Sequence, residues 1–246
     1  MADRRRGWNG GASVRAVVFD LFNTLTPPVD DAAFRAASIE MARAVGAEPH
    51  AFSQSWSDLW QERYDGTFPT VQACVRGVCE AIGVRASAAA IDEASRIRVD
   101  CTRRVLQPRP DALTTLARLR ALGLRTALVS NCIPEVPLLW PAMPYADAID
   151  VPLFSCAEGL TKPDPAIYLR ACERLRVDPT DCMYVGDGAQ GELTGAQRVG
   201  MRVLLITTPG RPAPELSEQE SWRGESIDAL GELPGLITAS GSAAAN

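Results

Sequence analysis

The second half of the chain alternates between short apolar runs and longer segments in which apolar residues recur at helical spacing. The short runs are rich in β-branched residues and are too short for helices, which predicts buried strands. The predicted strands are residues 125–131, 151–155, 182–187 and 202–206, and the predicted helices between them are residues 111–123, 165–176 and 193–199. Strands separated by helices of about 10 to 15 residues indicate right-handed βαβ units and a parallel sheet.

The strongest strand signal lies apart from these, in the run VRAVVFD at residues 14–20. After the turn-like sequence Thr26-Pro27-Pro28, residues 30–104 show helical spacing and almost no strand pattern. We therefore predict an α/β core interrupted by a helical insertion. The expected segments are a flexible N-terminus at 1–13, the core at 14–29 and 105–238, the insertion at 30–104, a proline-rich loop at 136–144, a surface connection at 209–225, a last strand and helix within 226–237, and a disordered tail at 239–246.

Composition narrows the class of function. The 246 residues are 46% hydrophobic, which suffices for a sizeable core, and the formal net charge of −5 indicates no broad basic face for nucleic acid or an anionic membrane. No apolar run approaches the roughly 18 to 20 residues that span a bilayer. We expect a cytoplasmic protein, monomeric or homodimeric, that acts on a small molecule. The seven cysteines form no C-x-x-C pair and are expected to be reduced core residues.

Polar side chains follow the predicted strands, where ligands of open parallel sheets bind. Asp20 ends the first strand, Ser130 and Asn131 end the second, and Asp187 ends a later one, while Lys162 lies between them in sequence. A carboxylate can attack phosphorus or carbon to give a covalent intermediate that water hydrolyses. A lysine, a hydroxyl group and Mg²⁺ between two aspartates would neutralise the developing charge.

Each of these residues also has an ordinary structural explanation. An aspartate or a Ser-Asn pair after a strand is typical of turns and helix caps, and a lysine before proline is usually solvated. The four positions together, in this order on a predicted βα scaffold, favour a catalytic site.

The same positions resemble the motifs of the haloacid dehalogenase-like superfamily. Residues 20–25 (DLFNTL) resemble motif I, Ser130 in LVSN motif II, Lys162 in KPDP motif III, and VGDGAQGELTGA, with Asp187 and Glu192, motif IV. The resemblance spans nearly the whole chain apart from its termini. It implies a Rossmann-like core, and it implies that the helical insertion is a C1 cap.

The resemblance also implies a role for each matching residue. Asp20 is the expected nucleophile, and Lys162 balances the charge of the carboxylates. Thr24 and Ser130 are expected to hold the phosphoryl oxygens, with Asn131 as a further substrate-binding candidate. The expected Mg²⁺ ligands are Asp20, Asp187 and the backbone carbonyl of Phe22, with Glu192 acting through water or by supporting the loop.

Phe22 departs from the phosphatase pattern, which has an aspartate two positions after the nucleophile. Phenylalanine cannot transfer a proton, and general acid–base catalysis contributes roughly 10² to 10⁴-fold. An aromatic residue here is common in 2-haloacid dehalogenases, and Tyr168 occurs in both branches. Dehalogenases, however, need no metal and have a shorter motif IV loop, whereas this chain retains Asp187 and Glu192. The motif IV residues favour Mg²⁺ and a phosphorus-centred substrate.

The expected cap carries aromatic residues at helical spacing, Trp56, Trp60 and Tyr64, which are more typical of packing than of a substrate site. A turn at Asp65-Gly66 is expected to project toward the core, which makes Arg63 and Arg76 candidates for binding a substrate anion. His50 lies outside every motif, and a capping role at the surface is expected for it.

Three functions remain open on the sequence. The favoured one is a Mg²⁺-dependent hydrolase that forms a covalent aspartyl intermediate on a small phosphorylated or phosphonated metabolite. The second is hydrolysis of a carbon–halogen bond in a 2-haloacid. The third is a catalytically weak binding or regulatory protein, which would have no need for Asp20, Ser130, Lys162 and Asp187 together.

Overall fold

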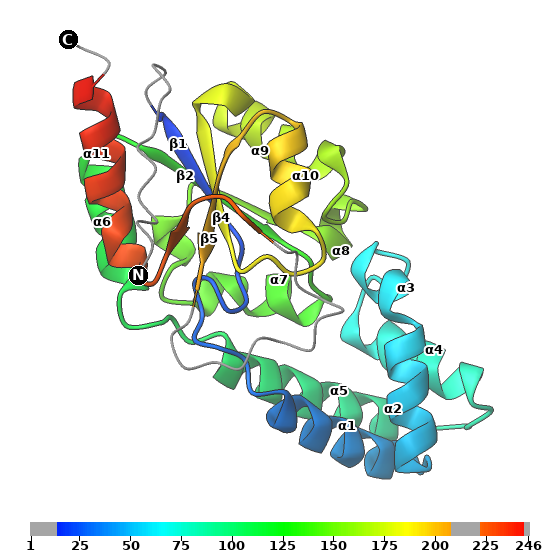
Figure 1. The fold of residues 1–246 in the computed structure, drawn as a ribbon. Coiled ribbons are helices and arrows are strands. Elements are labelled where there is room, and N and C mark those ends of the chain that lie inside the picture. Colours follow the sequence, from blue (N-terminus) through cyan, green and yellow to red (C-terminus); the bar gives the residue numbers. More distant parts are fainter. Residues whose placement is uncertain (1–13, 208–221, 244–246) are drawn as a thin grey trace.

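The computed structural model describes residues 14–207 and 222–243 and contains a six-stranded parallel sheet (Figure 1). The strand order is β3-β2-β1-β4-β5-β6, so that the first strand lies in the middle beside β2 and β4. The strands are β1 (Ala16–Phe19), β2 (Arg125–Ser130), β3 (Val151–Phe154), β4 (Cys182–Gly186), β5 (Arg202–Ile206) and β6 (Ser226–Ile227). The predicted α/β fold with a Rossmann-like sheet is confirmed.

Both faces of the sheet are covered by helices, as a parallel sheet requires. In β1, Val17 and Phe19 belong to one buried cluster, whereas Ala16 and Val18 belong to the other. Alternate side chains of a strand point to opposite faces, so a continuous apolar run provides buried side chains on both faces of the sheet. The covering helices are α6 (Ala112–Ala121) and α11 (Leu233–Ala243) on the first face, and α9 (Pro165–Leu175) and α10 (Glu192–Arg198) on the second (Figure 1).

Six helices lie between β1 and β2 in the sequence, and the first five of them pack as a separate layer beside the sheet (Figure 1). They form their own buried cluster around Met41, Phe52, Val75 and Ile91, which Ile133 of the core joins. The helices of this helical insertion are α1 (Asp31–Val45), α2 (Pro49–Asp58), α3 (Trp60–Tyr64), α4 (Val71–Ala81) and α5 (Ala88–Val105).

Local sequence signals explain where helices of the insertion begin and end. The side chain of Asp30 caps α1 by accepting a hydrogen bond from the backbone of Ala32, and Gly46 ends the helix in the left-handed conformation. Pro49 occupies the first turn of α2, where no backbone N–H is needed. His50 follows it and is exposed, but Glu48 caps the helix by accepting the backbone N–H groups of His50 and Ala51, so the capping role expected for His50 was wrong.

The connection after β2 differs from the prediction. Residues 136–144 were expected to form a proline-rich loop, but α7 (Glu135–Leu139) and the 3₁₀ helix η1 (Trp140–Ala142) occupy most of it. Pro137 lies within the first turn of α7, where a missing N–H costs no intrahelical hydrogen bond. The remaining short elements are α8 (Ser155–Glu158), η2 (Ala146–Ala148), η3 (Pro179–Asp181) and η4 (Leu230–Glu232).

The C-terminal end of the described chain differs from the prediction. Disorder was expected from residue 239, but α11 continues to Ala243, carried by the apolar face that Leu233 and Ile237 pack on the sheet. The expected flexible N-terminus at 1–13 and most of the expected surface connection, residues 209–221, lie outside the described residues. No described helix has the length and apolar character needed to cross a membrane.

Candidate active site

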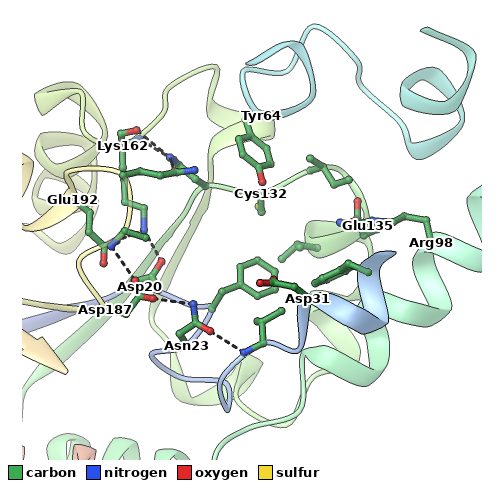
Figure 2. Close-up of a pocket in the computed structure, with 18 residues that line it drawn as sticks. Asp20, Asn23, Asp31, Tyr64, Arg98, Cys132, Glu135, Lys162, Asp187 and Glu192 are labelled. Atoms are coloured by element: carbon green, nitrogen blue, oxygen red, sulfur yellow. Dashed lines mark hydrogen bonds and ion pairs between the residues drawn. The ribbon is translucent and has the colours of Figure 1, made fainter. Parts of the chain in front are cut away.

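The side chains that follow the strands meet at one edge of the sheet, as predicted. Asp20 comes directly after β1 and Asp187 directly after β4, while Glu192 begins α10 and Lys162 precedes α9. All four are buried, and Figure 2 shows them grouped on one side of a cavity.

Lys162 lies at the centre of this group. Its Nζ donates to Asp20 Oδ1 at 2.5 Å and to Glu192 Oε2 at 2.6 Å, and it lies 3.3 Å from the hydroxyl of Tyr184. Burial alone would lower the pKa of Lys162, but the carboxylates of Asp20 and Glu192 outweigh it and raise the pKa. Lys162 therefore remains an ammonium ion that fixes both carboxylates.

Glu192 uses both of its oxygens within the protein. Oε2 accepts from Lys162 and from the Tyr184 hydroxyl at 2.7 Å, and Oε1 accepts the backbone N–H of Gly188 at 3.0 Å. Burial raises the pKa of Glu192, and Lys162 opposes part of that rise. Glu192 thus supports the motif IV loop, which agrees with the indirect role that the sequence predicted.

Asp187 is held by a residue that the sequence analysis did not single out. The Asn23 amide donates to Asp187 Oδ2 at 2.8 Å, while Asn23 Oδ1 accepts the backbone N–H of Val29. Asn23 has φ of 61°, a left-handed conformation that asparagine tolerates better than most residues. Burial and then the Asp20 carboxylate raise the pKa of Asp187, and hydrogen bonds from Ala189 and Asn23 oppose this.

The group fits a divalent cation. Asp20, Asp187 and Glu192 each offer a carboxylate oxygen, and these oxygens lie within 4.8 Å of one another. Three buried carboxylates face the one ammonium of Lys162, and burial raises the pKa of two of them. The excess negative charge calls for protons or a cation. A hard cation such as Mg²⁺ prefers carboxylate oxygens, so the donor set matches the predicted cofactor.

The two predicted hydroxyl residues lie beneath the site. Thr24 and Ser130 are fully buried, and neither hydroxyl finds a hydrogen-bond partner in the described part of the chain. A buried hydroxyl without a partner costs about 1 to 3 kcal/mol. Neither side chain reaches the cavity wall, so the structure brings them near the cluster without exposing them to the cavity.

A cavity of about 320 Å³ lies between the sheet edge and the helical insertion. Its wall contains Asp20, Lys162, Asp187 and Glu192 at the core side, together with Phe22 and residues of the insertion (Figure 2). The full set that lines it is Asp20, Phe22, Asn23, Val29, Asp31, Phe34, Tyr64, Arg98, Asn131, Cys132, Ile133, Glu135, Val136, Lys162, Asp187, Ala189, Gln190 and Glu192.

Comparison with known proteins agrees with this arrangement. A family model described as haloacid dehalogenase-like hydrolase matches residues 14–200, which covers all the site residues. The chain belongs to the haloacid dehalogenase-like hydrolase family. The resemblance carried by the four sequence motifs is thereby confirmed.

Relatives within the haloacid dehalogenase-like family have two kinds of activity. An (S)-2-haloacid dehalogenase 4A from Burkholderia cepacia is 30% identical over 81% of this chain and 86% of its own length. A ribulose-1,5-bisphosphate 5-phosphatase from Halopiger xanaduensis is 25% identical over 91% of this chain and 99% of its own length. A solved 2-haloacid dehalogenase from Pseudomonas syringae pv. tomato DC3000 has a TM-score of 0.68 and 26% identity, over 92% of this chain and 99% of that one.

The expected substrate-binding residues of the insertion do not line the cavity. Arg63 is buried against Trp56, with its Cζ 4.6 Å from the ring centroid, because α3 turns that side chain into the insertion. Arg76 is exposed on α4. Trp56 packs in the insertion core, in line with the packing expected for it, and Trp60 is exposed. The insertion supplies Arg98 of α5 to the cavity instead.

Asn131 lines the cavity, as a substrate-binding residue would, but its side chain is already engaged. Its Oδ1 accepts the backbone N–H of Lys162, and its Nδ2 donates to the carbonyl of Lys162 and to Gln190 Oε1. Asn131 therefore ties the end of β2 to the two loops that carry Lys162 and Asp187.

Several residues of the site escaped the sequence analysis. Asn23, Tyr184, Arg98 and Glu135 contact site residues or line the cavity, yet only Asn23 lies within a motif. The signal for Asn23 was its place in the turn after a strand. Tyr184 lies within the apolar run of β4, where the sequence gives no sign that its hydroxyl contacts the site. Arg98 and Glu135 have no feature in the sequence that distinguishes them from the other charged residues.

Proposed function

We propose that the protein is a Mg²⁺-dependent hydrolase that cleaves a phosphate or phosphonate bond of a small metabolite through a covalent intermediate on Asp20. The observation that carries the proposal is the excess of buried carboxylates over ammonium groups at the end of the central strands. A site that used no metal would have no need for Asp187 beside Asp20.

Mg²⁺ would be held by the carboxylates of Asp20 and Asp187, with the backbone carbonyl of Phe22 as a further ligand. When bound, it would offset the negative charge of a phosphoryl group. Glu192 has both oxygens engaged by protein donors, which supports an indirect role for it.

The residues of the chain suit an in-line displacement. An Asp20 oxygen forms a bond to phosphorus while the bond to the leaving group breaks, and the leaving group departs with the electron pair. Water then attacks the phosphoryl group, and the bond to Asp20 breaks to restore the carboxylate. Lys162 holds and orients the Asp20 carboxylate. The hydroxyls of Thr24 and Ser130 have no hydrogen-bond partner in the described part of the chain, and they would have to turn toward the cavity to donate to phosphoryl oxygens.

Phe22 lines the cavity at the position where a proton donor would be needed. Because a phenyl ring cannot protonate the leaving group, substrates whose leaving group is stable as an anion should react best. The helical insertion covers the cavity and would exclude water during attack, which is the function of a cap.

The same residue supports a second candidate. Phe22 at the cavity wall and the 2-haloacid dehalogenases among the relatives favour hydrolysis of a carbon–halogen bond through an ester on Asp20. This reaction needs no proton for the departing halide and no metal. In this reaction Asp20 would form the ester, but Asp187 beside it would have no role, so we place it second.

Product release from a panel of phosphorylated, phosphonated and halogenated small acids, with and without Mg²⁺, tests the proposal. We expect phosphate release that requires Mg²⁺, is fastest with 4-nitrophenyl phosphate or another good leaving group, and falls by about 10³-fold or more in Asp20→Asn. Asp92→Asn, an exposed change on α5, should retain activity.

Two other outcomes point elsewhere. Halide release without metal would establish the dehalogenase reaction instead. Binding of these acids with no turnover in the wild type would support a catalytically weak binding protein.

A further inference from the structure

A second polar cluster lies at the end of the cavity formed by the helical insertion. Arg98 of α5 lines the cavity, and its Nε donates to Glu135 Oε1 at 2.8 Å. The hydroxyl of Thr102 donates to the same oxygen at 3.1 Å. Figure 2 shows Arg98 and Glu135 across the cavity from Lys162 and Glu192, so the two clusters form separate ends of one space.

The protein holds the Arg98 side chain in one orientation and leaves its outer nitrogens available. The guanidinium Cζ lies 4.3 Å from the ring centroid of Phe34 and 5.5 Å from that of Trp56. Nε is used by Glu135, whereas Nη1 and Nη2 make no hydrogen bond to any residue in 14–207 or 222–243. A planar guanidinium with free outer donors matches a carboxylate or phosphate group, which accepts two parallel hydrogen bonds.

The cluster also carries a surplus of positive charge. Arg63 is buried beside Trp56 and forms no ion pair with the described residues, and its Nε lacks a hydrogen-bond partner there. Burial lowers the pKa of Arg63, and Arg98 adds to this while Glu135 opposes it, so the three charges interact. Two guanidinium groups thus lie near the buried carboxylate of Glu135, and only that of Arg98 pairs with it.

This surplus distinguishes the cluster from an ordinary ion pair between two helices. Asp31 also lines the cavity, but it is exposed and water screens its charge. Oε2 of Glu135 is buried without a partner in the described part of the chain, but it is an acceptor that an anion cannot satisfy, so the case for an anion rests on the two guanidinium groups. Buried charge of this kind is stabilised by a bound group of opposite sign.

We infer that Arg98 binds a carboxylate of the substrate, remote from the group that reacts at Asp20. A cavity of about 320 Å³ lies at the lower end of the range for small-molecule sites, which suits a short acid. The apolar side chains of Phe22, Ile133 and Val136 in the wall would contact its carbon chain. The substrate would then be a short carboxylic acid that also carries a phosphate or phosphonate group. The carboxylate is inferred from Arg98, whereas the phosphate or phosphonate group rests on the proposed function.

Calorimetric titration with 3-phosphonopropionate and its neutral amide, 3-phosphonopropionamide, in the presence of Mg²⁺ tests this inference. The two compounds have nearly the same shape, so a difference in Kd reports recognition of the carboxylate charge. We expect the wild type to bind the acid at least about tenfold more tightly than the amide. In Arg98→Gln the two Kd values should agree within about twofold.

Control variants separate recognition from folding. Arg103→Gln removes the same charge from an exposed position of α5, where Arg103 pairs with Asp100, and should retain the preference for the acid. Arg98→Gln leaves Glu135 buried without its counter-ion and risks unfolding, so the double variant Arg98→Gln/Glu135→Gln is measured as well. It should fold and should also lack the preference.

Equal Kd values for acid and amide in the wild type, a preference that persists in the double variant, or binding of neither compound would overturn the inference. The proposed reaction is judged separately by phosphate release. Phosphate release from esters without any preference for acids would refute only the role of Arg98. A preference for the acid in a protein that releases no phosphate would retain Arg98 and refute the reaction.

Discussion

At the scale of single residues, the hydrogen bonds to Glu192 determine how firmly Lys162 is held. The Tyr184 hydroxyl donates to Glu192 Oε2 at 2.7 Å in a fully buried setting. A hydrogen bond to a charged group contributes about 1.5 to 3 kcal/mol, whereas one between neutral groups contributes about 0.5 to 1.5 kcal/mol. Burial raises the pKa of Glu192 to about 8, so the carboxylate is ionised above that pH. We therefore expect Tyr184→Phe to lower the free energy of unfolding by about 2 kcal/mol at about pH 9, measured by urea denaturation.

The matched control is Tyr145→Phe. The Tyr145 hydroxyl is equally buried but donates to the neutral backbone carbonyl of Leu106, so its loss should cost about 1 kcal/mol. If the two variants lost the same stability, Glu192 would carry no charge in the folded protein. Tyr184→Phe should also weaken catalysis, because Glu192 would hold Lys162 less rigidly, whereas Tyr145→Phe should not.

The sequence predicted the charged residues of the site better than their supports. Asp20, Lys162 and Asp187 could be placed together because parallel strands bring their carboxyl ends to one edge of a sheet. Asn23 acts through a left-handed turn, and Arg98 reaches the cavity only because α5 packs beside α7. Such contacts depend on the packing of elements distant in sequence, for which a single sequence carries no local signal.

At the scale of secondary-structure elements, the junction of β4 and α10 depends on a glycine. A Cβ placed on Gly186 would lie 2.1 Å from Glu192 Oε1. Glycine at this position lets the start of α10 approach the end of β4 closely enough for Glu192 to reach Lys162. We expect Gly186→Ala to displace Glu192, to cost about 1 to 3 kcal/mol in urea denaturation, and to lower phosphate release severalfold.

Gly231→Ala provides the comparison for this substitution. A Cβ there would have nothing within 4 Å, so stability and activity should remain close to those of the wild type. A Gly186→Ala variant as stable and active as Gly231→Ala would mean that Glu192 can move without consequence. That result would contradict the supporting role assigned to Glu192.

The strands and helices agree with the sequence-based predictions wherever those predictions rested on hydrophobic periodicity. β1, β2, β4 and β5 lie within the predicted runs, and the five helices of the insertion lie within or just beyond 30–104. The exceptions were α7 and η1, where Pro137, Pro141 and Pro144 suggested a loop. Pro137 and Pro141 occupy positions in the first turns of these helices that need no backbone donor, so composition was misleading there.

At the scale of the whole molecule, the cavity exists because two separately packed layers meet over the sheet edge. The core provides the acids and Lys162, and the insertion provides Arg98, Phe34 and Tyr64. Ile133 of the core packs in the insertion cluster, and the ion pair between Arg98 and the buried Glu135 joins α5 to α7. Motion of the insertion would therefore change the shape of the site and the setting of Arg98 together.

Binding of Mg²⁺ should stabilise the entire fold if the paired acids form its site. A ligand present at 100 times its Kd stabilises the native state by about 2.7 kcal/mol, which for a chain of this size corresponds to a rise in Tm of about 5 to 11 °C. We expect this rise in calorimetry of the wild type, its reversal by chelation, and its absence in Asp187→Asn. Asp92→Asn should show the full rise, and Na⁺ at matched ionic strength should produce none. An equal rise in Asp187→Asn would place the bound ion elsewhere and remove the main support for phosphoryl chemistry over dehalogenation.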